Sequence, residues 1–242
     1  STTGRARIGY VPQEIALYLD LSGHQNLAFF ARLYGLKGAG AKARIDQVLD
    51  IVGLTDRAGD RVEHYSGGMQ RRLNIAAGLL HQPDLLILDE PTVGIDPQSR
   101  NMILEAVASL GRDGMSVLYT THYMEEAERL CARVGIVDHG RLLACGSRRE
   151  LVQLIDGQDQ VLLSVTGDAA AVAARLQEAK VVTSAQATST KEIACVTTDA
   201  SSKLSPIIAA VTESGATVTD LRVLEPTLDA VFLAITGTAL RD

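Results

Sequence analysis

Apolar and polar positions in the first part of the chain form short strand-like runs separated by helix-like stretches. The pattern predicts strands at residues 6–11, 84–88 and 116–121, with all four residues of the run 85–88 buried. It predicts helices over residues 26–34, 41–52, 68–80 and 100–110, the first behind a capping box formed by Ser22 and Gln25. Strands that alternate with helices predict an α/β fold around a parallel sheet.

The pattern changes in the second part of the chain. A helix at residues 125–130 and a hairpin of strands 134–137 and 142–145 precede a helix that starts at a Ser147–Glu150 capping box and ends near residue 155. Residues 156–158 form a predicted linker. Strands at 161–165, near 181, at 193–197 and at 216–224, with helices over 168–180 and 204–214, then predict a βαββαβ layer, and a last helix covers 226–235.

Two domains follow from this change. We predict a core domain at residues 1–156, with a helical subdomain at about 22–80, and a small α+β accessory domain at residues 157–242. The second domain contains no catalytic cluster, basic patch or phosphate loop in its sequence, so we interpret it as a regulatory or interface module.

Composition narrows the class of protein. The 242 residues are 46% hydrophobic and carry a net charge of −6, which disfavours a broad nucleic-acid-binding surface. Cys131, Cys145 and Cys195 have no CxxC spacing, which is typical of a reducing cytosol. No apolar run approaches the roughly 18 residues that a membrane span needs. The sequence therefore predicts a cytoplasmic protein that binds no nucleic acid.

Candidate chemistry lies between residues 65 and 90. Ser66 can cap a helix, and Gly67 and Gly68 leave open backbone N–H groups where an anion can approach. At the other end of this stretch Asp89 and Glu90 follow an apolar strand, at the sheet edge where ligands bind in open α/β folds. A helix start suited to phosphate and a paired acidic strand end together suggest nucleotide chemistry.

The acidic pair suggests a division of labour. Asp89 offers an oxygen ligand to Mg²⁺, and Glu90 is placed as a general base for a water that attacks a γ-phosphate. Gln13 and His122 each follow another predicted strand. A lone Gln in a loop is usually solvated, and a lone His at a strand end is usually structural. Because parallel neighbouring strands end together, we nevertheless expect both beside the acidic pair.

Helical spacing assigns two further groups of side chains. Three polar residues of the helix over 68–80 are expected on its exposed side: Arg71, Arg72 and Asn74. Four large apolar residues of the first helix form either a helix core, the favoured interpretation, or a face for a partner: Phe29, Phe30, Leu33 and Tyr34.

Five segments in order resemble a known family. YVPQE, YSGGMQRRL, LLILDEP, GIDP and TTHYMEEAE are similar to the Q-loop, signature, Walker B, D-loop and switch-histidine segments of ABC transporter ATP-binding subunits. The resemblance covers about residues 7–155. The second domain, with its ending EPTLDAVFLAITG, resembles the tail domain of drug-export ATPases of the daunorubicin-resistance type. The implied fold is a P-loop NTPase-like ABC ATPase core with a helical subdomain.

The resemblance implies roles at matching positions. Gln13 would sense the γ-phosphate and the metal, Asp89 would serve Mg²⁺, Glu90 would polarise water, and His122 would hold the γ-phosphate and the water. The signature positions would contact the nucleotide of an opposite subunit: Ser66, Gly67, Gly68, Met69 and Gln70. The carboxylate of Asp96 would cross the dimer interface. Without the resemblance, Asp96 would be interpreted only as the N-cap of a helix.

ATP and Mg²⁺ are the implied ligands. The implied partners are a second ATP-binding subunit in a head-to-tail dimer and a transmembrane permease subunit, which would hold the protein at the inner face of the cell membrane. DNA-repair and chromosome-organising ATPases share parts of the signature segment. The acidic balance and the TTHYMEEAE segment place them further away.

The sequence departs from the family in one respect. It contains no G-x-x-x-x-G-K-[ST] loop, and Ser1-Thr2-Thr3 lies too close to Gln13 to be its remnant. We therefore expect an N-terminally truncated fragment. Losing about four charge-assisted hydrogen bonds removes on the order of 6 kcal/mol, or roughly four decades of affinity, so we expect this chain alone to be inactive.

Three hypotheses remain at the level of sequence. The first is an ATP-hydrolysing subunit that powers an exporter. The second is a non-catalytic partner that donates its Ser66–Gly68 segment to the ATP site of another subunit. The third adds a sensing role for the C-terminal module, which only its position in the chain motivates.

Overall fold

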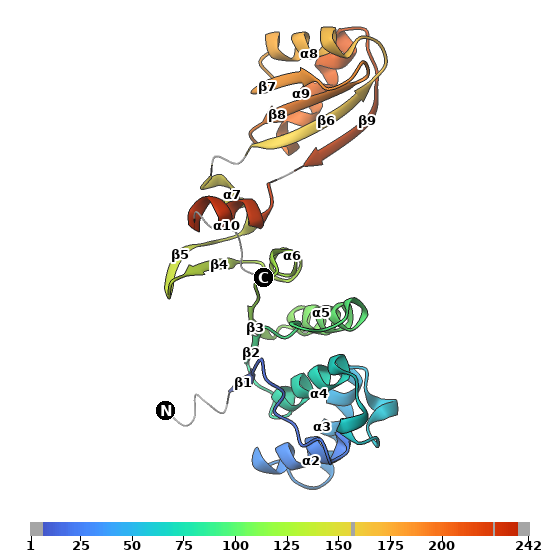
Figure 1. The fold of residues 1–242 in the computed structure, drawn as a ribbon, viewed down its shortest axis with the longest axis vertical. Coiled ribbons are helices and arrows are strands. Elements are labelled where there is room, and N and C mark those ends of the chain that lie inside the picture. Colours follow the sequence, from blue (N-terminus) through green and yellow to red (C-terminus); the bar gives the residue numbers. More distant parts are fainter. Residues whose placement is uncertain (1–6, 156–157, 225, 237–242) are drawn as a thin grey trace. The chain divides into compact units, whose positions relative to one another are not determined.

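The first of two compact units, residues 1–131, contains a three-stranded parallel sheet (Figure 1). The computed structural model describes residues 7–155, 158–224 and 226–236. The strands are β1 (Ile8–Val11), β2 (Leu85–Asp89) and β3 (Ser116–Thr120), with β2 in the middle. The sheet and its intervening helices confirm the predicted α/β organisation.

The two faces of this sheet differ in burial. Leu86 and Leu88 of β2 are fully buried, whereas Leu85 and Ile87 are only half-buried. The expectation that all four residues are buried is therefore correct for two of them. The reason is the period of a strand: alternate side chains point to opposite faces, and the hydrophobic core of this unit lies on the face of Leu86 and Leu88.

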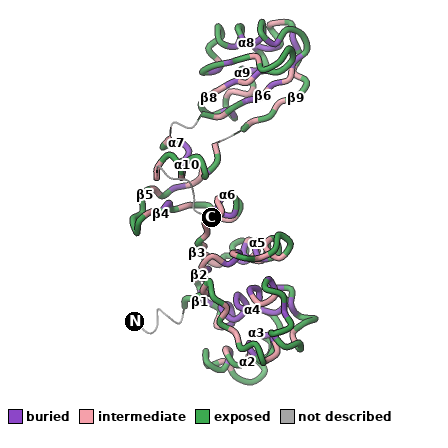
Figure 2. Tube along the Cα trace, viewed as in Figure 1, coloured by how far each residue is buried: buried purple, intermediate pink, exposed green. Residues whose placement is uncertain are grey.

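Helices α2 (Gly23–Leu33), α3 (Gly38–Ile51) and α4 (Gly67–Leu79) pack together, with two short 3₁₀ turns, Thr55–Arg57 and Val62–His64, between α3 and α4. The Ser22–Gln25 capping box is present, as predicted. Helix α4 is the most buried of the three (Figure 2). It lies close to β1, because Gly78 has no Cβ; one added there would come within 2.7 Å of Val11.

The burial of α4 corrects one prediction. Arg71, Arg72 and Asn74 are buried rather than exposed, with 5%, 7% and 4% of their surface accessible. Each reaches a backbone group of a neighbouring segment: Arg71 donates to the Pro12 carbonyl at 3.0 Å, Arg72 to the Val52 carbonyl at 2.7 Å, and Asn74 accepts from the Ala16 N–H at 3.4 Å. Polar groups tolerate burial when they find such partners.

Helices α3 and α4 hold each other's carboxyl ends. The Arg72 guanidinium on α4 binds the carbonyls of Val52 and Gly53 just after α3, and Arg44 on α3 binds the carbonyls of Leu79 and Leu80 at the end of α4. The last carbonyls of a helix have no partner within it, and cations are favourable there. Each arginine therefore caps the other helix.

The interpretation of the large apolar side chains of α2 as a helix core holds for one of them. Phe30 packs against the core, whereas Phe29, Leu33 and Tyr34 are 41%, 70% and 42% exposed. The helix is amphipathic, but its apolar arc is wider than the face that α3 and α4 cover. The exposed part leaves the alternative, a partner face, open.

Two further helices complete this unit. Helix α5 (Pro97–Arg112) begins at Asp96, whose side chain accepts a hydrogen bond from the Ser99 N–H, and Pro97 occupies its first turn. Helix α6 (Met124–Leu130) follows β3 after a short loop that carries His122. Helix α5 begins after the loop that follows β2, and helix α6 begins after the loop that follows β3.

The second compact unit, residues 132–242, begins with the predicted hairpin, β4 (Val134–Asp138) and β5 (Arg141–Gly146). Helix α7 (Arg148–Gln153) starts at the predicted Ser147–Glu150 capping box. Helix α10 (Leu228–Thr236) packs on α7, with Leu151 and Leu228 fully buried, and Arg148 donates to the Pro226 carbonyl at 2.9 Å.

The βαββαβ layer is confirmed. Strands β6 (Asp159–Val165), β7 (Ser184–Ala187), β8 (Glu192–Thr197) and β9 (Val218–Leu224) form an antiparallel sheet in the order β7-β8-β6-β9. Helices α8 (Ala169–Glu178) and α9 (Ala200–Glu213) bury one face of it, and Cys195 lies in their core. The strand expected near residue 181 begins three residues later, at Ser184.

The division into compact units falls after residue 131, whereas the predicted domain boundary falls after residue 156. The hairpin and α7 belong to the compact unit that also holds the layer. Residues 156 and 157 of the predicted linker at residues 156–158 lie outside the described residues. The domain boundary at residue 156 therefore stays a prediction from the sequence.

Candidate functional site

The register of the sheet brings the ends of the three strands to one edge. Val11 pairs with Leu88, and Leu88 pairs with Tyr119, so the residues that follow each strand emerge at the same level. Four predicted site residues lie at or just beyond these strand ends: Gln13, Asp89, Glu90 and His122. Such an edge is the usual ligand site of parallel sheets.

Asp89 is held at this edge by two hydroxyl groups. Thr120 donates to its Oδ1 at 2.7 Å, and Tyr10 on β1 donates to its Oδ2 at 3.3 Å. The carboxylate is half-buried. Both of its oxygens keep further lone pairs, so it can still bind a cation.

Glu90 and His122 lie in contact. Nδ1 of His122 is 3.3 Å from Oε1 of Glu90, and about 30% of each side chain is exposed (31% and 30%). When Glu90 is ionised it can only accept, so Nδ1 is the donor of this pair and Nε2 faces away from it. The arrangement joins a carboxylate base to a group that can orient or hold an anion.

The backbone at Glu90 is unusual. Its φ is 43°, in the left-handed region, which costs a non-glycine residue on the order of 1 kcal/mol or more. Thr120 holds it there, because its carbonyl and its hydroxyl both accept from the Glu90 N–H, at 3.2 and 3.0 Å. The strain turns the Glu90 side chain out of the strand direction.

Gln13 lies in the exposed loop after β1, and the structure gives its side chain no hydrogen bond within the described residues. The flanking loop is fixed from α4, through the bonds of Arg71 to Pro12 and of Asn74 to Ala16. Gln13 therefore presents its amide from a supported loop.

The amino end of α4 forms a second cluster. Ser66 caps the helix by accepting from the Met69 N–H at 3.2 Å, and Ser66 and Gly67 are exposed. Gly68 is buried against α5: a Cβ there would lie 2.2 Å from Ser99 Oγ and 2.3 Å from Ser99 Cβ. The lack of a side chain at Gly68 thus serves packing, whereas a Cβ at Gly67 would make only an ordinary contact with Ile95 Cδ1 at 3.8 Å.

The other predicted residues of this cluster have structural partners. Met69 packs against the core, and the Gln70 amide donates to the carbonyls of Val62 and Tyr65 at 3.2 and 3.4 Å. Asp96 caps α5, and hydrogen bonds from Ser99 lower the pKa of its carboxyl. Among the described residues no hydrogen bond joins this cluster to Asp89, Glu90 or His122.

Magnesium suits the sheet edge only as an ion that brings its own ligands. In the described part of the chain, no group of three or more His, Cys, Asp or Glu side chains is close enough together to form a metal cage. Mg²⁺ typically binds through one or two carboxylates and completes its shell with waters and substrate phosphates. A single Asp89 carboxylate, steadied by hydroxyl groups, fits that mode.

Sequence reasoning missed the residues that support the site. Thr120 and Tyr10 fix Asp89 and Glu90, and Arg71 and Asn74 fix the Gln13 loop. Thr120 could have been found, because it is the residue of β3 that pairs with Asp89 in the register. The Arg71 and Asn74 contacts join segments far apart in sequence and left no local signal.

Comparison with known proteins decides the family. A family model described as ABC transporter matches residues 1–93. The chain is 46% identical over 241 residues to the linearmycin resistance ATP-binding protein LnrL of Bacillus subtilis, an alignment that covers 98% of this chain and 77% of that protein. The chain belongs to the ABC transporter ATP-binding proteins. This relative carries the name of a drug-resistance ATP-binding protein, which confirms the resemblance seen in the sequence.

A second relative agrees with the first. The daunorubicin resistance ATP-binding protein DrrA3 of Streptomyces coeruleorubidus is 40% identical over 234 residues, covering 96% of this ABC protein and 73% of the relative. Both alignments extend through the βαββαβ layer, so the accessory module is shared with these relatives.

Solved structures confirm the ABC ATPase fold. A structure of the ATP-binding subunit of an ABC transporter matches with a TM-score of 0.56 and 30% identity, over 64% of each chain. CbiO1 from Clostridium perfringens, part of the ABC transporter complex cbiONQ, matches with a TM-score of 0.57 and 27% identity, over 63% of this chain and 62% of that one. None of the helices described for this ABC protein is long and apolar enough to cross a membrane.

Proposed function

We propose that this protein is the ATP-hydrolysing subunit of an exporter and couples ATP hydrolysis to transport across the cell membrane. The observation that carries the proposal is the contact of Glu90 with His122 at the strand edge, next to Asp89. Family membership and the drug-resistance names of the relatives support it.

In this proposal Glu90 takes a proton from the water that attacks the γ-phosphate of ATP. His122 holds Glu90 through Nδ1 and offers Nε2 to the phosphate or the water. Mg²⁺, when bound through Asp89, would supply charge neutralisation on the phosphates. Gln13, on its supported loop, would report on the occupancy of the same site.

The second cluster serves the other half of a head-to-tail dimer. The exposed Ser66 and Gly67 lie at the start of α4, where backbone N–H groups favour an anion. We assign this helix start to the γ-phosphate of the nucleotide on the partner subunit. Asp96 lies beside it, since Gly68 contacts Ser99 of the helix that Asp96 caps.

Helix α2 supports a permease partner. Tyr18 and Phe29 form an edge-to-face pair with ring centroids 5.0 Å apart, and both are exposed, together with Leu19 and Leu33. Exposed apolar groups gathered in one place are typical of interaction surfaces. Docking here would place the protein on the inner face of the membrane.

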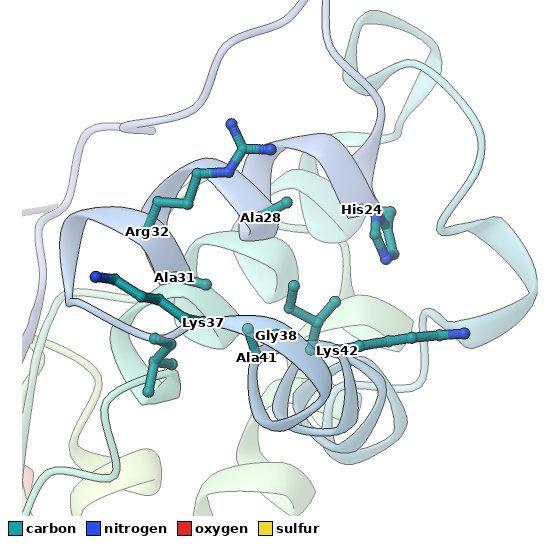
Figure 3. A pocket seen from close by; sticks show the side chains of 10 residues that line it. His24, Ala28, Ala31, Arg32, Lys37, Gly38, Ala41 and Lys42 are labelled. Carbon is teal, nitrogen blue, oxygen red and sulfur yellow. The ribbon is translucent and has the colours of Figure 1, made fainter.

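A basic groove lies on the same subdomain. It has a volume of about 680 Å³, lies between α2 and α3, and has an apolar floor that includes Ala31 (Figure 3). Its other lining residues include His24, Arg32, Lys37 and Lys42, and none of the described residues that line it is acidic. In a chain of net charge −6, this local excess of cations favours an acidic segment of the permease.

For the 242-residue polypeptide on its own we propose a narrower role. Its sequence contains no G-x-x-x-x-G-K-[ST] loop, so it would bind ATP weakly and would not turn it over. Its helix start at Ser66 and Gly67 would still be presented to an ATP-loaded partner. A subunit that carries Ser66→Arg has an impaired helix start of its own. Adding the 242-residue polypeptide to that subunit should then restore ATP hydrolysis.

The test of the main proposal uses the protein produced from its complete gene. Glu90→Gln keeps the size of the side chain but removes the base. The steady-state ATPase rate should fall at least about 100-fold while ATP binding, measured by titration calorimetry, changes less than about threefold.

Glu125→Gln is the matched control, because Glu125 lies exposed on α6. Its ATPase rate should stay within about twofold of the unmodified protein. A Glu90→Gln protein that hydrolyses ATP as fast as the unmodified one would show that Glu90 is not the base.

A further inference from the structure

The carboxylate of Glu126 on α6 is buried, with 3% of its surface accessible. Burying a carboxylate is costly unless several donors hold it. No part of the proposed hydrolysis uses Glu126, and its side chain is buried among residues that follow the strand ends. The buried Glu126 carboxylate therefore has a role other than the hydrolysis step itself.

Three hydroxyl groups donate to it, one from the segment after β2 and two from residues at or just after the end of β3. Thr92 Oγ1 lies 2.7 and 3.0 Å from its two carboxylate oxygens, Tyr119 OH lies 2.8 Å from Oε2, and Thr121 Oγ1 lies 2.9 Å from Oε2. Burial raises the pKa of Tyr119, so its phenol remains a donor at neutral pH. Hydrogen bonds to a charged acceptor are about twice as strong as neutral ones.

These donors flank the reacting pair. Thr92 follows Glu90 by two positions, with Pro91 between them, and Thr121 directly precedes His122. Thr121 also accepts from the Tyr123 N–H at 3.0 Å, so the backbone on both sides of His122 is tied to the same hydroxyl. One buried carboxylate thus holds the segment that carries the base and the segment that carries its histidine.

We infer that Glu126 is a positioning residue that sets the Glu90–His122 contact by joining the segments at Thr92 and Thr121. It contacts neither the nucleotide nor the water. The inference rests on the proposed function for its kinetic consequence, but its structural consequence can be measured without ATP hydrolysis.

Arg100 extends this link to α5. Its Nε lies 3.6 Å from Oε1 of Glu126, an ion pair slightly longer than a hydrogen bond, and its guanidinium lies 4.3 Å from the ring centroid of Tyr123. Tyr123 in turn stacks on His122, with ring centroids 4.3 Å apart. The helix capped by Asp96 is therefore in contact with both Glu126 and the histidine segment.

The first experiment measures amide hydrogen exchange in the 242-residue polypeptide. Glu126→Gln replaces the charged acceptor with a neutral amide, so the hydrogen bonds from the three hydroxyl groups lose their charge assistance and the ion pair with Arg100 is removed. Exchange should accelerate at least tenfold at residues 92–93 and 121–123 and change less than twofold in α3 and α4. Glu125→Gln on the exposed face of α6 is the control and should change neither region.

The second experiment is a double-mutant cycle in the protein produced from its complete gene. Glu126→Gln should lower kcat at least tenfold with a change in KM for ATP below threefold. In a His122→Ala background the same substitution should lower kcat less than twofold, because the contact that it positions is already gone. Equal losses in both backgrounds would identify a general destabilisation and overturn the inference.

Two milder variants keep the test open if Glu126→Gln does not fold. Thr92→Val and Tyr119→Phe each remove one donor to Glu126 and preserve the shape of the side chain. Both should accelerate exchange at residues 121–123 through the shared carboxylate. Unchanged exchange there in both variants would overturn the inference. If exchange responds but no variant hydrolyses ATP, including the unmodified protein, the positioning role stands and the proposed function fails.

Discussion

At the scale of single residues, Gly67 and Gly68 stand side by side and have different roles. A Cβ on Gly67 would make an ordinary van der Waals contact with Ile95 Cδ1 at 3.8 Å, whereas a Cβ on Gly68 would overlap Ser99 Cβ at 2.3 Å. Ser99 Cβ is fixed to the backbone of α5, so rotation of the serine cannot relieve the overlap. The position that must lack a side chain for packing is Gly68.

Substitution of each glycine by alanine separates the two roles. Both lie in the first turn of α4, so the gain in helix propensity is the same and cancels in the comparison. We expect Gly68→Ala to lower the free energy of unfolding by about 1–3 kcal/mol relative to Gly67→Ala, because it forces α4 and α5 apart. Urea denaturation of both variants measures this difference, and equal stabilities would contradict it.

The acidic pair could be found from the sequence because two adjacent carboxylates directly after a buried strand rarely serve packing. The positions of Arg71, Arg72 and Asn74 could not. Their polarity suggested an exposed face, but their partners are backbone carbonyls and an N–H that are distant along the chain. Local patterns do not show which distant backbone groups remain in need of a partner.

At the scale of helices, α3 and α4 form a pair in which each carries the arginine that caps the other. The guanidiniums of Arg44 and Arg72 bind carbonyls that would otherwise lack partners. Burial lowers the pKa of both arginines, yet a guanidinium is not deprotonated in proteins, so both stay charged near neutral pH. Their contribution to stability should therefore not change with pH across the neutral range.

Arg72→Met tests this pair. Methionine keeps the apolar stem in the core but leaves the carbonyls of Val52 and Gly53 without their donor. We expect a loss of about 1–3 kcal/mol in the free energy of unfolding, measured by urea denaturation. Arg112→Met, at an exposed position on α5, is the control and should stay within about 0.5 kcal/mol. A loss no larger than that of the control would remove the capping role.

Helices, strands and helix caps could be predicted from the sequence more readily than the contacts between them. Caps at Ser22, Ser66, Asp96 and Ser147 are local, because a side chain and an N–H a few residues away suffice to form them, and all four are present. The strand expected near residue 181 begins instead at Ser184 because its start depends on pairing with β8, which the local run of residues does not encode.

At the scale of the whole molecule, the basic groove between α2 and α3 predicts how the permease is recognised. The double substitution Arg32→Glu with Lys42→Glu should weaken binding to the co-expressed permease subunit at least tenfold, and added salt should weaken binding of the unmodified protein. Co-purification and surface-based binding assays measure both effects. Arg112→Glu is the control, and an unchanged affinity of the double variant would exclude the groove.

The packing of α10 on α7 in the second unit could not be predicted from the sequence. The strands and helices of the βαββαβ layer were predicted in order, but the packing of α10 on α7 joins residues on either side of the layer. Helices α7 and α10, in which Leu151 and Leu228 are fully buried, pack together only when the chain returns, and a local pattern carries no information on that return.

That return has a genetic consequence. A stop codon anywhere between residues 156 and 227 removes α10 whole, and so removes the helix that packs on α7 whatever the fate of the layer itself. An in-frame deletion confined to the layer spares α10. Nonsense alleles of this region should therefore be harsher than in-frame deletions of equal length, even though the affected residues lie far from the nucleotide-binding segments in the sequence.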